Sequence, residues 1–227
     1  MDVNSLVQTV AIYALPVLFA ITLHEAAHGY VARHFGDMTA HAEGRITLNP
    51  LRHAELVGTV LVPLLMLYFS SWKFLFGWAK PVPVNYSALR NPRRDMALVA
   101  AAGPAANLLM LLAWAVALKL AVTAAPGKAA FMVAAMAEAG VTVNLVVMVI
   151  NLIPILPLDG GRIVMSLLPR QSAVQYARFE KWSGHALTAL VLFAVLDNMA
   201  NDGKFIARSF APLGDLAQHL VRSIVFG

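Results

Sequence analysis

Long apolar segments alternate with short polar loops along most of the chain. The apolar segments cover residues 6–31, 56–76, 96–122, 131–156 and 187–199. A run of about 20 apolar residues is long enough to span the hydrocarbon core of a bilayer as a helix. The pattern therefore predicts an all-α polytopic membrane protein. A final stretch at 205–226 mixes apolar with charged residues, and it fits either an interfacial helix or a sixth span.

Composition supports this interpretation. Hydrophobic residues make up 59% of the 227 residues and charged residues only 13%, and the mean hydropathy is +0.70. Soluble domains carry about 25% charged residues, so the chain is expected in a lipid bilayer. The chain has no cysteine, and a metal ion would therefore be held by nitrogen and oxygen ligands. We expect no nucleic-acid partner, because the net charge of +5 does not come from a basic, aromatic-rich stripe.

The basic residues are distributed unevenly among the loops. Loops 32–55, 77–95 and 159–182 each contain several arginine or lysine residues, whereas residues 123–130 contain one lysine. Positively charged loops favour the cytoplasm. We therefore expect these three loops on the cytoplasmic side of the cell membrane, and residues 123–130 and the N-terminus on the other side.

Segment 56–76 has a basic loop on both sides. This arrangement favours a re-entrant segment that enters and leaves on the cytoplasmic face, with breaks at Pro63 and at the two serines that follow later. Its length also permits a plain transmembrane helix. Two strand-like pieces flank the segment, at residues 44–48 and 80–85, so we expect a β-hairpin region here. The prolines of the second piece confine it to a sheet edge.

The first apolar segment contains the sequence His24-Glu25-Ala26-Ala27-His28. Residues four apart share one face of a helix, so the two histidines can offer imidazole nitrogens to one metal ion. The glutamate between them can take a proton from an attacking water and act as general base. Ionisable side chains are costly inside a membrane helix, and this favours a functional site over a chance match.

Catalytic zinc usually has three protein ligands, and Asp159 is the preferred candidate for the third. It follows two prolines that break the apolar segment 131–156, and it precedes two glycines that let the backbone turn. His24 and Asp159 are both expected near the cytoplasmic ends of their helices, and therefore in the same leaflet. Asn151 lies eight residues before Asp159 on roughly the same helix face, where its amide could donate to a peptide oxyanion.

Three other residues are candidates for the third ligand. His34 follows His24 by ten residues, which is the spacing of a longer metalloprotease motif, but Val31 stands where that motif needs glycine. Glu43 and Glu55 are acidic residues of a basic loop, where a solvated charge is the ordinary explanation. Asp159 is preferred over all three.

Three motifs together carry a resemblance to a known family. They are His24-Glu25-Ala26-Ala27-His28, Gly103-Pro104-Ala105-Ala106-Asn107, and Asn151 followed by Leu158-Asp159-Gly160-Gly161. In this order, and with the connecting sequence 77–83, they resemble the site-2 protease family of intramembrane zinc metalloproteases. We interpret the second motif as shaping the cavity, with Asn107 as a weaker polar contact.

The resemblance implies a core of three helices with flanking helices and one bound zinc ion. It assigns the metal to His24, His28 and Asp159, the general base to Glu25, and a place beside the catalytic centre to Asn151. The chain is similar to the minimal form of the family, which has no PDZ or CBS domain. We expect one membrane-embedded domain over residues 1–227, with the zinc core at 6–165 and C-terminal helices at 183–227.

The predicted function is zinc-dependent hydrolysis of peptide bonds in or next to transmembrane segments, with membrane proteins or peptides as substrates. The active site is expected towards the cytoplasmic leaflet. A metal transporter is one alternative, but it would need polar residues through both leaflets, and here they cluster in one. An inactive relative that serves as a binding module is the other alternative, and the presence of every expected catalytic residue argues against it.

Overall fold

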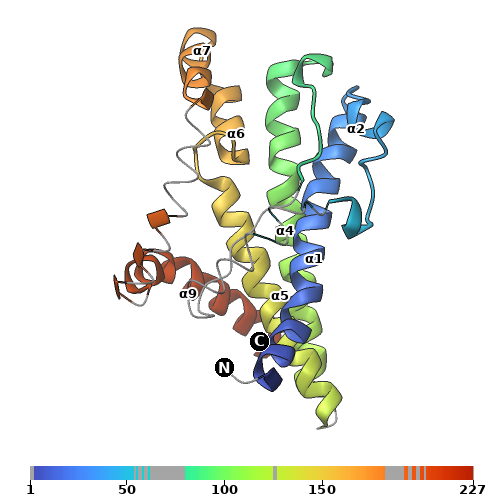
Figure 1. Cartoon of the computed structure of the whole chain (residues 1–227), viewed down its shortest axis with the longest axis vertical. Coiled ribbons are helices and arrows are strands. Elements are labelled where there is room, and N and C mark those ends of the chain that lie inside the picture. Colours follow the sequence, from blue (N-terminus) through green and yellow to red (C-terminus); the bar gives the residue numbers. More distant parts are fainter. Residues whose placement is uncertain are drawn as a thin grey trace.

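The computed structural model describes residues 3–53, 55, 58, 61, 80–124, 127–181, 192–193, 196–197, 200–201 and 203–226. Three long helices form its centre, namely α1 (Val3–His34), α4 (Pro92–Thr123) and α5 (Lys128–Leu152). Figure 1 shows all three running along the longest axis of the molecule, and α4 packs against both of the others. The prediction of an all-α membrane protein with a three-helix core is confirmed.

The surface of the three central helices suits a bilayer. Among the described residues, these are the helices that are long and apolar enough to cross a membrane. Their outward faces carry large exposed hydrophobic side chains, among them Leu109, Leu120 and Phe131. Such side chains lose nothing when they contact lipid tails, because lipid is as apolar as a protein core.

Small residues allow the central helices to approach one another. Ala20, Ala26 and Ala32 of α1 are almost completely buried. On α4, Leu111 and Ala115 pack with Val141 of α5 in a common hydrophobic cluster. Interfaces between membrane helices rely on this close packing, since the surrounding lipid provides no hydrophobic driving force between them.

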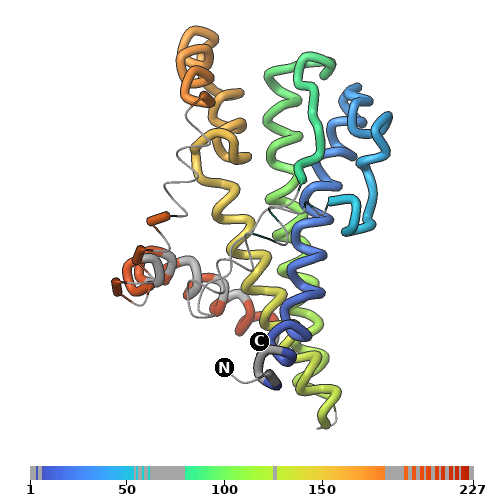
Figure 2. Tube along the Cα trace, in the orientation of Figure 1, coloured from blue at the N-terminus to red at the C-terminus, as the bar shows by residue number. Residues whose placement is uncertain are grey.

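The loops and short helices gather at one end of the bundle. This end carries α2 (Thr39–Ala42), the 3-10 helices η1 (Pro50–Arg52) and η3 (Tyr86–Ala88), and the helices α6 (Asp159–Leu167) and α7 (Arg170–Arg178). The turn between α4 and α5 lies at the opposite end (Figure 2). The described residues of the three basic loops thus lie at one end of the bundle (Figure 1).

The last described helix is α9 (Lys204–Phe226). It runs across α4 and α5 rather than alongside them (Figure 1), and its residues Val221 and Ile224 pack against the hydrophobic cluster of these two helices. It is not among the helices that are long and apolar enough to cross a membrane. Nearly all of segment 56–76 and most of segment 187–199, for which we predict a re-entrant hairpin and a span, lie outside the described residues.

The prediction of strands at 44–48 and 80–85 is wrong. Neither segment is a strand, and none of the other described residues forms one. Segment 80–85 is held mostly by side chains instead: the Arg45 guanidinium donates to the carbonyls of Lys80 and Pro81, and the backbone amide of Asn85 donates to the Asp37 carboxylate. One backbone bond adds to these, from the Lys80 amide to the His53 carbonyl. Prolines at two of the segment's six positions remove the donors that a strand ladder would need.

Candidate metal centre

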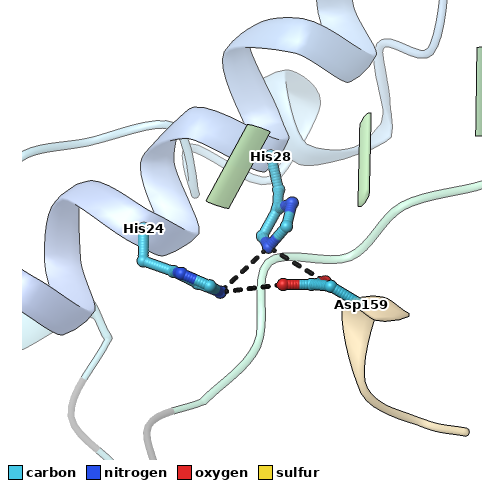
Figure 3. A group of neighbouring side chains, drawn as sticks. All are labelled: His24, His28 and Asp159. Carbon is cyan, nitrogen blue, oxygen red and sulfur yellow. Dashed lines mark hydrogen bonds and ion pairs between the residues drawn. The ribbon is translucent and has the colours of Figure 1, made fainter. Parts of the chain in front are cut away.

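The bundle brings the three expected metal ligands together. His24 and His28 project from α1 towards the carboxylate of Asp159, which is the first residue of α6 (Figure 3). The distance is 3.2 Å from His24 Nε2 to Asp159 Oδ2, 3.3 Å from His28 Nε2 to Asp159 Oδ1, and 3.1 Å between the two Nε2 atoms. In the described part of the chain, no other group of three His, Asp or Glu residues lies close enough to hold a metal. The group formed by His24, His28 and Asp159 does not include His34, Glu43 or Glu55.

Hydrogen bonds to the far side of each ring determine which nitrogen faces the site. His28 Nδ1 lies 2.7 Å from the carbonyl oxygen of Val99, and His24 Nδ1 lies 2.5 Å from Asn107 Oδ1. Carbonyl oxygens only accept hydrogen bonds, so both Nδ1 atoms must carry hydrogen. In the neutral imidazole, each Nε2 atom then directs a lone pair towards Asp159 and towards the other ring.

The close spacing of these three side chains favours a cation bound between them. Two imidazole Nε2 atoms and a carboxylate face one another at little more than 3 Å, and buried Asp159 Oδ2 has no hydrogen-bond partner among the described residues. Acceptors in such a group repel one another unless a positive charge lies between them. Two imidazole nitrogens and one carboxylate oxygen are ligands that zinc binds. The residues present fit a zinc ion.

Gly103 of α4 provides the room for this group. A Cβ atom at this position would lie 2.5 Å from both His24 Cε1 and His28 Nε2. These are atoms of rings that hydrogen bonds hold in place, so they have little freedom to move aside. Glycine at 103 is therefore a requirement of the site, which gives a physical reason for the motif that begins there.

Glu25 is held next to the two histidines by the backbone of segment 80–85. Its Oε2 atom accepts a hydrogen bond of 2.6 Å from the amide of Val82. Gly29, one turn further along α1, allows Ile46 and Val82 to lie close to the helix, because a Cβ there would lie 3.0 Å from Ile46 and 3.2 Å from Val82. The loop end of the bundle thus fixes the carboxylate that the sequence nominates as general base.

Asn151 occupies a different setting from the one expected for an oxyanion donor. Its side-chain amide donates to the carbonyl of Val147 in its own helix at 3.0 Å, and the residue is half-buried. The hydrogen bonds of the described residues do not join it to the two histidines or to Asp159. A catalytic role would use the second hydrogen of this NH2 group, because the bond to Val147 takes only one of the two.

Sequence reasoning missed one polar residue near the site. Asn144 of α5 is fully buried and accepts a hydrogen bond from Asn107, which in turn contacts His24. The signal available in the sequence was an amide side chain in the middle of an apolar segment, where an unpaired polar group is costly.

A tyrosine and an arginine lie at the edge of the site, outside the membrane-spanning helices. Burial raises the pKa of the Tyr86 hydroxyl above its usual range, although the nearby Arg162 guanidinium lowers it in part. That guanidinium lies 4.9 Å from the centre of the Tyr86 ring. Tyr86 is therefore neutral at physiological pH and keeps its hydroxyl hydrogen.

Comparison with known proteins finds similarity to a peptidase family and to zinc metalloproteases. The model of peptidase family M50 matches residues 120–194. The chain is 34% identical over 218 residues to "Putative zinc metalloprotease YwhC" of Bacillus subtilis, covering 88% of this chain and 92% of that protein. It is 28% identical over 183 residues to "Putative zinc metalloprotease Rip2" of Mycolicibacterium smegmatis, covering 79% of this chain and 66% of that protein. No solved structure matches significantly.

Proposed function

Because the chain belongs to peptidase family M50, the site-2 protease family of zinc metallopeptidases, we propose that it cuts membrane proteins in or next to their transmembrane segments. The observation that carries this proposal is the position of the candidate site. The two histidines and Glu25 lie on α1, a helix long and apolar enough to cross a membrane. A substrate that reaches them must therefore be in, or close to, the bilayer.

In this proposal His24, His28 and Asp159 hold one zinc ion. When bound, zinc supplies the Lewis acidity that polarises a carbonyl group and lowers the pKa of water towards about 7. The histidines contribute neutral nitrogen donors, and the carboxylate offsets one of the two positive charges. The Nδ1 hydrogen bonds keep both rings turned towards the ion.

Glu25 is the proposed general base. It accepts a proton from the attacking water and passes that proton to the leaving amine, which completes peptide-bond hydrolysis. The hydrogen bond from the Val82 amide orients the carboxylate before substrate arrives. Preorganisation of this kind avoids reorganisation during the reaction.

Segment 80–85 is proposed to lie beside the bound substrate. A transmembrane helix must unwind locally before its carbonyls can be attacked. The segment passes directly by Glu25, because Val82 is the residue that donates to it. A peptide that unwinds at this end of the bundle would therefore pass close to the base.

One experiment tests the proposed function as a whole. Membrane-protein fragments are compared by mass spectrometry in cells that express either the wild-type chain or Glu25→Gln. Fragments that depend on the wild-type chain should have ends within or next to predicted transmembrane segments. Wild-type-dependent cuts confined to loops and domains far from the bilayer would contradict the proposal.

The site is proposed to face the cytoplasmic leaflet, and single cysteines can test this. The chain has no native cysteine, so cysteines introduced at Ala54 and Ser87 report only their own positions. We expect an impermeant thiol reagent to label neither in intact cells and both after the membrane is opened. Labelling of just one of them in intact cells would show that the segment 56–76 between them crosses the membrane.

A catalytic role of Asn151 predicts a specific pattern among variants. Asn151→Asp and Asn151→Leu should retain zinc and thermal stability but cut turnover by about 10²–10³-fold, the usual cost of one oxyanion donor. If the amide serves only its bond to Val147, both variants should cleave normally. Zinc content, melting temperature and cleavage rate are measured on the same preparations. Normal cleavage by a stable Asn151→Leu variant would exclude the catalytic role.

A further inference from the structure

We propose that Asn107 and Asn144 act as a pair of positioning residues that set the tautomer and orientation of His24. This inference rests on the proposed zinc site, to which His24 contributes one ligand. The three side chains come from three different helices, α4, α5 and α1. Both asparagines have 0% exposure, so neither has access to solvent.

The pair is oriented by two backbone carbonyls. Asn144 Nδ2 donates to the carbonyl of Gly140 at 2.8 Å, and Asn107 Nδ2 donates to the carbonyl of Ala20 at 3.2 Å. A carbonyl oxygen only accepts, so it requires the NH2 end of each amide on its side. The opposite assignment of either amide would bring two acceptors together.

These two contacts determine the rest of the chain of hydrogen bonds. Asn144 Oδ1 faces the Asn107 NH2 group at 3.0 Å, and both hydrogens of that group are then used. Asn107 Oδ1 is left to face His24 Nδ1 at 2.5 Å. The imidazole must donate there, and in the neutral ring, the form that binds a metal, its Nε2 atom then carries the lone pair that faces Asp159.

The Nδ1 atoms of the two histidines have different kinds of hydrogen-bond partner. His28 donates to the main-chain carbonyl of Val99, which no side-chain substitution removes. Among the described residues, His24 Nδ1 has the Asn107 side chain as its partner. Partners of this kind fix the tautomer and ring orientation of a metal-binding histidine, and their loss typically costs about 10–100-fold in metal affinity.

The pair also explains why two amides are tolerated in this core. Every polar atom of Asn107 is used, with two donors and one acceptor engaged, as a buried amide requires. A pair that served stability alone could be replaced by two apolar residues of similar size at little cost. Zinc affinity would not return in that replacement, because His24 would still lack its partner.

The test uses Asn107→Leu, Asn144→Leu and the double variant, with Leu111→Ala as control. Leu111 lies one turn from Asn107 on α4 and is buried against α5, so this control loosens the same interface without touching His24. Zinc affinity is measured by chelator competition, and melting temperature on the same samples. We expect Asn107→Leu to bind zinc about 10–100-fold more weakly, and the double variant to regain stability without regaining affinity.

A spectroscopic arm examines the metal-free protein. Nitrogen NMR of chains with labelled histidine reports which ring nitrogen is protonated, and the His24 signals are identified by their loss in His24→Gln. We expect hydrogen on Nδ1 in the wild-type chain and a mixture of tautomers in Asn107→Leu. The Leu111→Ala control should resemble the wild-type chain.

Three results would overturn the inference. They are an unchanged His24 tautomer in Asn107→Leu, recovery of zinc affinity in the double variant, and equal weakening by Leu111→Ala. Failure of the wild-type chain to bind zinc would instead contradict the proposed function. The NMR arm would still decide the role of Asn107 in that case, because it needs no metal.

Discussion

Glu25→Gln should leave the zinc content and the fold unchanged and lower peptidase activity by about 10²–10⁴-fold, the range that general base catalysis contributes. Glutamine has nearly the same shape, and its amide oxygen can still accept the hydrogen bond from Val82. It cannot take a proton from water. The measurement is the rate of substrate cleavage by purified protein in lipid vesicles, with zinc content determined in parallel.

The matched control for this variant is Glu43→Gln. Glu43 is an exposed carboxylate of the same loop end, and it is outside the candidate metal group. The Glu43→Gln substitution removes the same negative charge outside the site, so peptidase activity should stay at the wild-type level. A Glu25→Gln chain that cleaves at a normal rate would mean that another group serves as base.

Gly103→Ala should abolish zinc binding, and peptidase activity with it. The added methyl group would lie 2.5 Å from His28 Nε2 and 2.6 Å from His24 Nε2, in the space that both donors need. Alanine is the better helix former by about 1 kcal/mol, so the intrinsic preference of α4 for helix should rise. A loss of zinc would therefore reflect the site rather than the helix.

Gly127→Ala serves as the control for this substitution. A Cβ at residue 127 would meet nothing within 4 Å, and this turn lies at the other end of the bundle. Zinc content by mass spectrometry and cleavage rate should both match the wild-type chain. One zinc ion per chain in Gly103→Ala would refute the close approach of α4 to the histidines.

The central helices and the candidate site were predictable from sequence for physical reasons. Only a helix satisfies its own backbone hydrogen bonds in lipid, so an apolar run of sufficient length has few alternatives. The spacing of His24 and His28 then places both rings on one helix face. Asp159 could be added because the two prolines before it follow the end of α5, which lies close to the two histidines of α1.

Segment 80–85 shows why other parts could not be predicted. Its alternating valines and prolines indicate an extended backbone, and the backbone is indeed not helical. Its partners, however, are side chains such as Arg45 and Asp37 from distant parts of the sequence. No local pattern distinguishes these partners from a neighbouring strand.

The contact between Asn107 and Asn144 could not be predicted from the sequence for a related reason. Each asparagine is recognisable as a polar residue within an apolar segment. The hydrogen bond between them depends on how three helices cross. The same crossing places His24 at the end of the resulting chain of hydrogen bonds. That crossing is a property of tertiary packing, and single-sequence periodicity does not contain it.

X-ray absorption at the zinc edge shows directly whether His24, His28 and Asp159 bind one zinc ion. The purified wild-type chain should contain one zinc ion, with two imidazole nitrogens at about 2.0–2.1 Å and carboxylate oxygen at about 2.0–2.2 Å. The Asp159→Ala chain should lose the metal or show a spectrum without that oxygen. A wild-type spectrum without two imidazoles, or an unchanged spectrum in Asp159→Ala, would contradict zinc binding by these three residues.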